Sequence, residues 1–122
     1  RANPMRFRGK EDDIGGSANF ALCYDTFQYF RCADDTLFLD RVGLIHVSGI
    51  TRADLLPGEL TEPDRGLVTA GDRVGNIEKL QLAFAAGFSG FVSTGPFSPE
   101  ARRDPYLPSA LRRSLDLIRA AM

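Results

Sequence analysis

The sequence of 122 residues contains no tryptophan, one histidine and two cysteines. Its 15 lysines and arginines are balanced by 16 aspartates and glutamates, so it lacks the basic excess typical of nucleic-acid-binding domains. No apolar run approaches the roughly 18–20 residues that a membrane helix requires, and no signal peptide is recognisable. We therefore expect neither a nucleic acid nor a membrane as a partner, and we predict a cytoplasmic protein.

The two cysteines, Cys23 and Cys32, do not form a CxxC motif, and no histidine-rich segment lies beside them. We expect two small buried side chains in a reducing compartment, with a disulfide between them as the alternative. Hydrophobic residues make up 43% of the chain and charged residues 25%, which is typical of globular proteins. The length corresponds to one domain.

Three short apolar runs, at residues 20–24, 42–47 and 90–93, predict β-strands. Continuous apolar runs are typical of strands that are covered on both faces, as in parallel sheets. A fourth strand is expected to end near Pro4 and Met5.

Helical spacing of apolar residues predicts a helix over residues 76–86, with Asn76 as its N-cap and Gly87 as its C-terminal stop. A second helix is predicted from near Pro108 to the last residue. Residues 52–72 are rich in proline and glycine, which predicts a long loop of the kind that often carries function.

Strands that alternate with helices predict an α/β fold with parallel strands. We divide the chain into residues 1–19, a degenerate strand with a polar linker, and residues 20–122, which form the α/β domain. A further short helical piece is expected at residues 35–40.

Polar residues stand at the ends of two predicted strands, where open and closed α/β sheets bind their ligands. Asp25 follows the first apolar run, and His46, the single histidine, lies in the second. Carboxylate and imidazole are standard ligands of divalent metal ions. The alternatives are that Asp25 caps a turn or helix and that His46 is a core residue.

Three segments taken together point to a known family: Tyr24–Gln28, Gly43–Gly49 and Ala85–Glu100, connected through residues 64–76. In their order and spacing they resemble the xylose isomerase-like TIM barrel superfamily, also called the sugar phosphate isomerase/epimerase group. The nearest branch is that of inosose dehydratases and isomerases. The resemblance implies the C-terminal half of a TIM barrel. It also implies a divalent-metal-dependent isomerase, epimerase or dehydratase that acts on a sugar or polyol.

The resemblance further implies a set of site residues. Asp25 and His46 would bind the divalent metal, which could be Mn, Co, Zn or Mg, and would take part in catalysis. Arg65, Gln28 and Asn3 would contact the substrate.

The sequence departs from the family at ligand positions. Gly95 stands where the family has a glutamate before Pro-Phe, and Asn3 stands where it has its first glutamate. Gln28 replaces a frequent histidine. Because two of the family's metal-ligand positions are not acidic, we expect impaired activity. The alternatives are a non-catalytic relic that binds a ligand or a protein, and a fragment of a longer barrel enzyme.

A complete barrel of this kind has eight strands in about 250 residues, and the matching segments correspond to its second half. We therefore expect a homo-oligomer, or a complementary half-barrel chain as a partner. The first residue is Arg1 rather than methionine, which is expected of a fragment.

Overall fold

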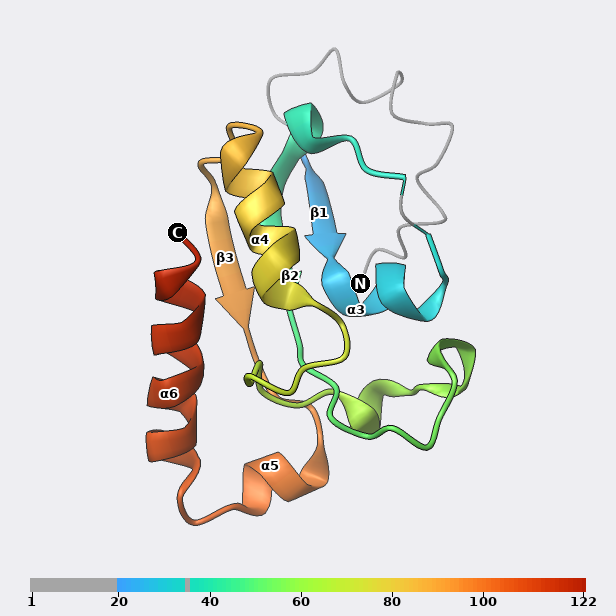
Figure 1. Ribbon diagram of the computed structural model, residues 1–122, viewed down its shortest axis with the longest axis vertical. Coiled ribbons are helices and arrows are strands. Elements are labelled where there is room, and N and C mark those ends of the chain that lie inside the picture. The colour runs from blue at the N-terminus through green and yellow to red at the C-terminus, as the bar shows by residue number, and fades with distance from the viewer. Residues whose placement is uncertain (1–19, 35) are drawn as a thin grey trace.

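A three-stranded parallel sheet in the order β1-β2-β3 forms the centre of the protein. The computed structural model describes residues 20–34 and 36–122. The strands are β1 (Leu22–Asp25), β2 (Val42–Val47) and β3 (Phe91–Thr94). The arrowheads of β1 and β3 point the same way in Figure 1, and β2 pairs with both in parallel. The predicted parallel α/β fold is confirmed. The predicted strand near Pro4 and the division at residue 19 fall outside the described residues.

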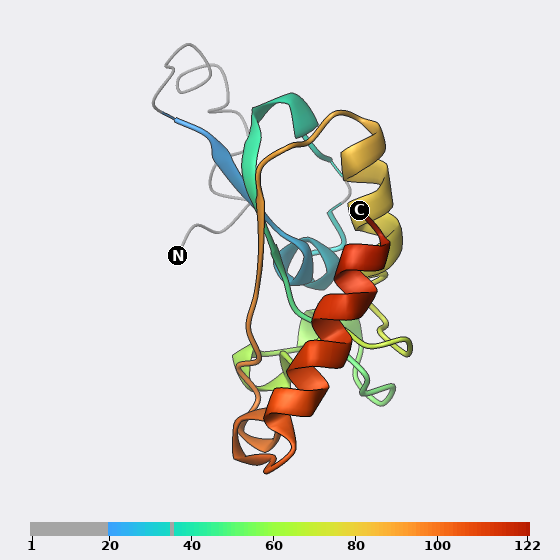
Figure 2. The ribbon, with the colours of Figure 1, turned by 90° about the vertical axis from the view of Figure 1, so that its left-hand side faces the viewer.

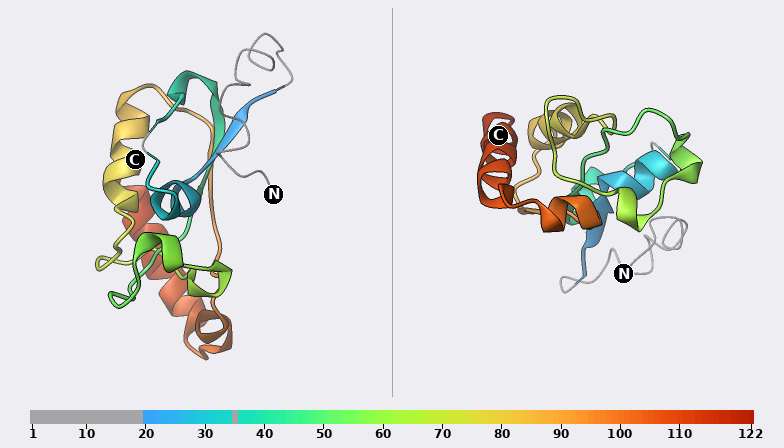
Figure 3. Two further views of the ribbon diagram at one scale, coloured as in Figure 1. Left: turned by 90° about the vertical axis from the view of Figure 1, so that its right-hand side faces the viewer. Right: turned by 90° about the horizontal axis from the view of Figure 1, so that it is seen from below.

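Helices and short 3₁₀ turns connect the strands. In chain order they are α3 (Thr26–Arg31), η1 (Leu39–Arg41), η2 (Pro57–Glu59), η3 (Glu62–Asp64), α4 (Asn76–Ala85), α5 (Pro99–Arg103) and α6 (Leu107–Ala120). Seen along the sheet, α4 and α6 lie on the same side of the strands (Figure 2). The view from below in Figure 3 places α5 and the loop with η2 and η3 at the end where the strands terminate. This end is the carboxyl edge of the sheet, at which α/β proteins bind ligands.

The core lies between the sheet and the helices α4 and α6. Ile45 and Val47 of β2 are fully buried, and they belong to one cluster with Leu80 of α4 and Ile118 of α6. These strand residues are two apart, so their side chains share a face of the sheet. Burial of each such aliphatic side chain contributes about 1.5–3 kcal/mol.

The opposite face of the sheet is open and partly apolar in the described residues. Phe91 is 83% exposed, and Leu44 and Cys23 are also exposed. The prediction of buried cysteines is therefore wrong, because alternation along β1 turns Cys23 toward this open face, and Cys32 is exposed as well. The two cysteines are not joined to each other.

Of three local helix predictions, the cap at Asn76 and the short helical piece at residues 35–40 need correction, and the stop at Gly87 is confirmed. Asn76 is the first residue of α4 rather than its cap, since Gly75 takes the N-cap position with a left-handed φ of 74°. The predicted stop at Gly87 is confirmed, and its φ of 99° is one that glycine adopts without strain. At the predicted helical piece, residues 35–40, the described residues contain only the short 3₁₀ turn η1, which begins at Leu39 and ends at Arg41.

Among the described residues, no helix combines the length and the apolar character that crossing a bilayer requires.

Candidate functional site

The strand register brings polar side chains together at the carboxyl edge. Asp25 of β1 stands opposite His46 of β2, and His46 stands opposite Ser93 of β3. His46 Nδ1 lies 2.7 Å from Ser93 Oγ. The two residues that the sequence singled out are therefore neighbours, as expected of parallel strands whose ends share one edge.

Asp25 has a second, local role at the start of α3. Its Oδ1 accepts a hydrogen bond of 3.2 Å from the backbone N–H of Gln28, so the carboxylate is the N-cap of the helix. A carboxylate at this position satisfies one of the unpaired N–H groups of the first turn and favours the helix dipole. The capping alternative drawn from the sequence is thus part of what Asp25 does.

Arg65 is the central side chain of the site. Its side chain is fully buried, and Nη2 lies 3.0 Å from each carboxylate oxygen of Asp25, which is only 2% exposed. Nε donates to Ser48 Oγ at 3.0 Å, and Nη1 donates to the carboxylate of Glu62 at 3.2 Å. A buried charge is tolerated only when it is paired and hydrogen-bonded, and Arg65 meets both conditions.

The Arg65 guanidinium lies over two aromatic rings. Its central carbon lies 4.5 Å from the ring centre of Phe27 and 4.9 Å from that of Phe97. The Arg65 carbonyl oxygen also accepts from the backbone N–H groups of Phe97 and Ser98, at 2.9 and 2.7 Å. Arg65 thereby joins the chain segments that follow β1, β2 and β3.

Gln28 and Glu62 complete this group of residues. The Gln28 side chain is almost fully buried and donates from Nε2 to Glu62 Oε1 at 3.1 Å. Glu62 itself is half-exposed. We call Asp25, Gln28, His46, Glu62, Arg65 and Ser93 the strand-end cluster.

Sequence reasoning missed Glu62, Ser48 and Ser93. Glu62 lies in a Pro- and Gly-rich loop without periodicity, and the only available signal was an acidic residue three positions before Arg65. The predicted substrate residue Asn3 lies outside the described residues.

A carboxylate network holds the loop after β2 in place beneath this cluster. Asp72 Oδ1 accepts from the N–H groups of Ile50 and Val74, at 2.9 and 3.0 Å. Asp72 Oδ2 accepts from the backbone and the side chain of Asn76, at 3.0 and 2.7 Å. Asn76 Nδ2 also donates to the Ser48 carbonyl oxygen at 2.9 Å. The network therefore ties the start of α4 to the segment that supports Arg65.

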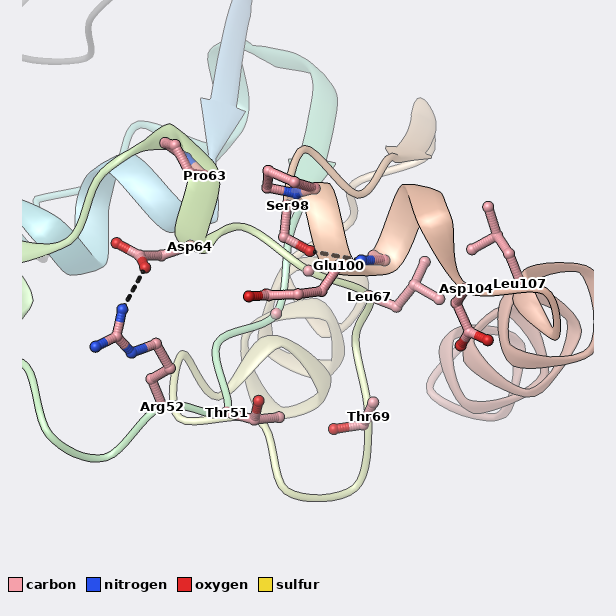
Figure 4. Close-up of a pocket in the computed structure, with 14 residues that line it drawn as sticks. Thr51, Arg52, Pro63, Asp64, Leu67, Thr69, Ser98, Glu100, Asp104 and Leu107 are labelled. Carbon is pink, nitrogen blue, oxygen red and sulfur yellow. Dashed lines mark hydrogen bonds and ion pairs between the residues drawn. The ribbon is translucent and has the colours of Figure 1, made fainter.

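A pocket of about 570 Å³ lies next to the strand-end cluster (Figure 4). Figure 4 shows the Arg52–Asp64 ion pair on one side of it and Asp104 on the other. Its lining includes Ser98, which directly follows Phe97, one of the two rings that contact Arg65. The lining of this pocket includes neither Asp25 nor His46, so the pocket and these predicted site residues are adjacent but distinct.

Ionisation at the pocket follows from its hydrogen bonds. The backbone N–H of Thr61, which donates to Oδ2 at 2.8 Å, lowers the pKa of Asp64, and Arg52 lowers it further. Hydrogen bonds to a carboxylate favour its charged form. Asp64 is therefore ionised at neutral pH.

The described residues do not fit a divalent metal ion in this arrangement. Both Asp25 oxygens contact the Arg65 guanidinium, and Gly95 offers no ligand atom at the family's glutamate position. No group of three or more His, Cys, Asp or Glu side chains within residues 20–34 and 36–122 is suited to hold a metal ion.

Comparison with solved structures places this arrangement among known folds. A xylose isomerase domain-containing protein from Salmonella typhimurium LT2 matches with a TM-score of 0.76 and 20% identity, over 91% of this chain and 43% of that one. The IolI protein, solved with a bound zinc atom, matches with a TM-score of 0.76 and 18% identity, over 95% of this chain and 44% of that one. A xylose isomerase domain protein from Alicyclobacillus acidocaldarius matches with a TM-score of 0.68 and 17% identity, over 94% and 42%.

No family model and no curated protein matches the sequence. The structural matches nevertheless establish the class: an α/β half-barrel with the fold of the C-terminal half of a xylose isomerase-like TIM barrel. The resemblance predicted from the sequence is confirmed at the level of the fold. The chain spans 43% of the length of the Salmonella protein.

Proposed function

We propose that this half-barrel binds a sugar or polyol at the carboxyl edge of its sheet. The observation that carries the proposal is the convergence of Asp25, His46 and Ser93 from three adjacent strand ends. A hydroxyl-rich ligand requires several fixed donors and acceptors in one place, and this edge is where parallel α/β sheets supply them.

The members of the strand-end cluster divide into two roles under this proposal. His46 and Glu62 retain exposed surface and are the groups that contact ligand hydroxyls. Phe97, 42% exposed with its ring centre 6.0 Å from that of His46, supplies apolar surface beside them. Gln28 and Arg65 are buried and hydrogen-bonded within the protein. We therefore assign them to positioning rather than to contact with the ligand.

Calorimetric titration with a panel of pentoses, hexoses and cyclic polyols tests the proposal. We expect His46→Gln to weaken the affinity for the best ligand at least tenfold. Glu100→Gln, a control change in the adjacent pocket, should alter it less than twofold. The proposal is wrong if no compound in the panel binds. It is equally wrong if Glu100→Gln abolishes binding that His46→Gln leaves intact, because the ligand would then lie in the pocket.

The zinc atom named for the IolI structure is the motive for a second candidate, a metal-dependent isomerase or epimerase with Asp25 and His46 as ligands. This candidate requires the Asp25 carboxylate to release the Arg65 guanidinium before it can bind an ion. Its test is deuterium incorporation from heavy water into the carbon-bound hydrogens of a sugar, in the presence of added Mn²⁺. If the wild type incorporates deuterium and Asp25→Asn abolishes the incorporation, the protein is a metal-dependent enzyme rather than a binding protein.

We also propose that the open sheet face pairs with another half-barrel, either a second copy or a complementary chain. Support comes from the parallel edges of β1 and β3, which have no neighbouring strand among the described residues, and from the exposure of Phe91. Exposed edges and large exposed apolar side chains favour association.

Sedimentation velocity tests this pairing with a matched pair of variants. We expect Phe91→Asp to dissociate the complex, and Leu82→Asp, on the outer surface of α4, to leave it intact. A wild-type chain that stays monomeric and melts cooperatively without a partner would refute the pairing.

A further inference from the structure

We infer that the Arg65 guanidinium is the built-in cation of the strand-end cluster and keeps a divalent metal ion away from the Asp25 carboxylate. The inference rests on the proposed function, because it states how the sugar or polyol site works: without a metal. Arg65 is a positioning residue in this account.

The first argument is the occupancy of Asp25. Each carboxylate oxygen already contacts Arg65 Nη2 at 3.0 Å, and one also accepts from the Gln28 N–H. A divalent ion binds carboxylate oxygens at about 2.0–2.6 Å. An ion at that distance would therefore lie directly beside a buried guanidinium, where like charges repel strongly because little water screens them.

The second argument is that Arg65 is held too firmly to move aside. Its side chain is fully buried, and its guanidinium lies over the rings of Phe27 and Phe97. Its Nε is bound to Ser48, and its own carbonyl oxygen anchors the segment after β3. An arginine stays charged in proteins, so deprotonation offers no escape from the repulsion.

The third argument is the poverty of the remaining ligand set. Among the described residues of the strand-end cluster, Asp25 and His46 supply one carboxylate and one imidazole, and Gly95 has no side-chain ligand. The carboxylate of Glu62 is itself paired with Arg65. Metal affinity rises with the number and charge of the ligands. Two ligands therefore compete poorly with an ion pair that is already formed.

The loss of the electron paramagnetic resonance signal of free Mn²⁺ on binding tests the inference. Mn²⁺ prefers oxygen and nitrogen ligands, so the exposed thiols of Cys23 and Cys32 disturb this measurement little. Four proteins are compared: the wild type, Asp25→Asn, Gly95→Glu, and Gly95→Glu combined with Arg65→Met. The Gly95 change is tolerable because a Cβ at that position meets no atom within 4 Å.

We expect the wild type and Asp25→Asn to bind Mn²⁺ equally weakly, within twofold of each other. Gly95→Glu alone should gain less than threefold, whereas the double variant, freed of the guanidinium, should gain at least tenfold over Gly95→Glu. A fivefold or larger loss of affinity in Asp25→Asn would overturn the inference. So would a folded double variant that binds no better than Gly95→Glu. If Arg65→Met does not fold, the comparison of the wild type with Asp25→Asn decides.

A sugar titration in the presence of EDTA separates this inference from the proposed function. Unchanged affinity in EDTA supports both. If EDTA abolishes sugar binding, the inference that Arg65 takes the place of a metal ion is wrong, while sugar binding itself is established. If no sugar binds, the proposed function fails, and the Mn²⁺ comparison still gives its own answer.

Discussion

The buried ion pair between Arg65 and Asp25 predicts a strong energetic coupling that a double-mutant cycle measures. Asp25→Asn keeps the shape and the helix cap, but it leaves the guanidinium with the half-exposed Glu62 as its charged partner. Arg65→Met keeps a long side chain between Phe27 and Phe97 and leaves a buried carboxylate. The first change leaves a buried cation with one charged partner fewer, and the second leaves a buried anion without its arginine.

Removal of one partner of a buried pair costs about 3–5 kcal/mol, whereas removal of both costs much less than the sum. Because Glu62 and the Gln28 N–H retain some compensation, we take the lower end, about 3 kcal/mol for each single change. With about 3 kcal/mol for the double change as well, the coupling energy is about 3 kcal/mol. At a urea slope of about 2 kcal/mol per molar, each single change lowers the unfolding midpoint by about 1.5 M.

Urea unfolding followed by circular dichroism gives the four free energies of the cycle. The control cycle uses Arg119→Met and Asp116→Asn, an exposed pair on α6 at 3.8 Å, for which the coupling should stay below about 0.5 kcal/mol. A coupling at Arg65–Asp25 below about 1 kcal/mol, or equal to that of the control, would refute the reasoning.

Three further changes have defined outcomes in the same unfolding assay. Gly49→Ala should cost about 2 kcal/mol, because its Cβ would fall on the Leu67 carbonyl group, whereas Gly58→Ala, with open space around it, should stay within about 0.5 kcal/mol. Ser114→Ala should stabilise by about 1 kcal/mol, since its buried hydroxyl has no partner in the part of the chain that the structure describes; a loss of stability would contradict this. Asp64 has a lowered pKa, so its contribution is complete above its unfolded pKa of about 3.9 and disappears as the pH falls through the lower folded value. Asp64→Asn should therefore flatten the loss of stability in acid, and an unchanged pH profile would contradict the assignment.

Helix length decided which helices could be predicted: the two long helices α4 and α6 are confirmed, and the short ones were not predicted. α4 is long enough for its apolar spacing to be read, and the positive φ of Gly87 ends it where glycine predicts. The helices α3 and α5 have six and five residues, too few for a periodic pattern. Their N-caps carry the remaining local signal. Asp25 was among the predicted caps, whereas the start of α5, Ser98 followed by Pro99 at the first helical position, was not predicted.

The sequence by itself determined the approximate positions of the three described strands, their parallel direction and the placement of Asp25 and His46 at one edge, because continuous apolar runs are a local property. The order of the strands came from the structure. The sequence also indicated the half-barrel fold through the spacing of several segments. Only the tertiary structure decided what Asp25 binds. Arg65 is 40 positions away from it, and the Gly49–Gly66 bridge helps to close the loop that brings the two together. A buried carboxylate requires a cation as its partner. Which cation that is depends on the residues that the tertiary fold brings beside it, and no local sequence pattern predicts it.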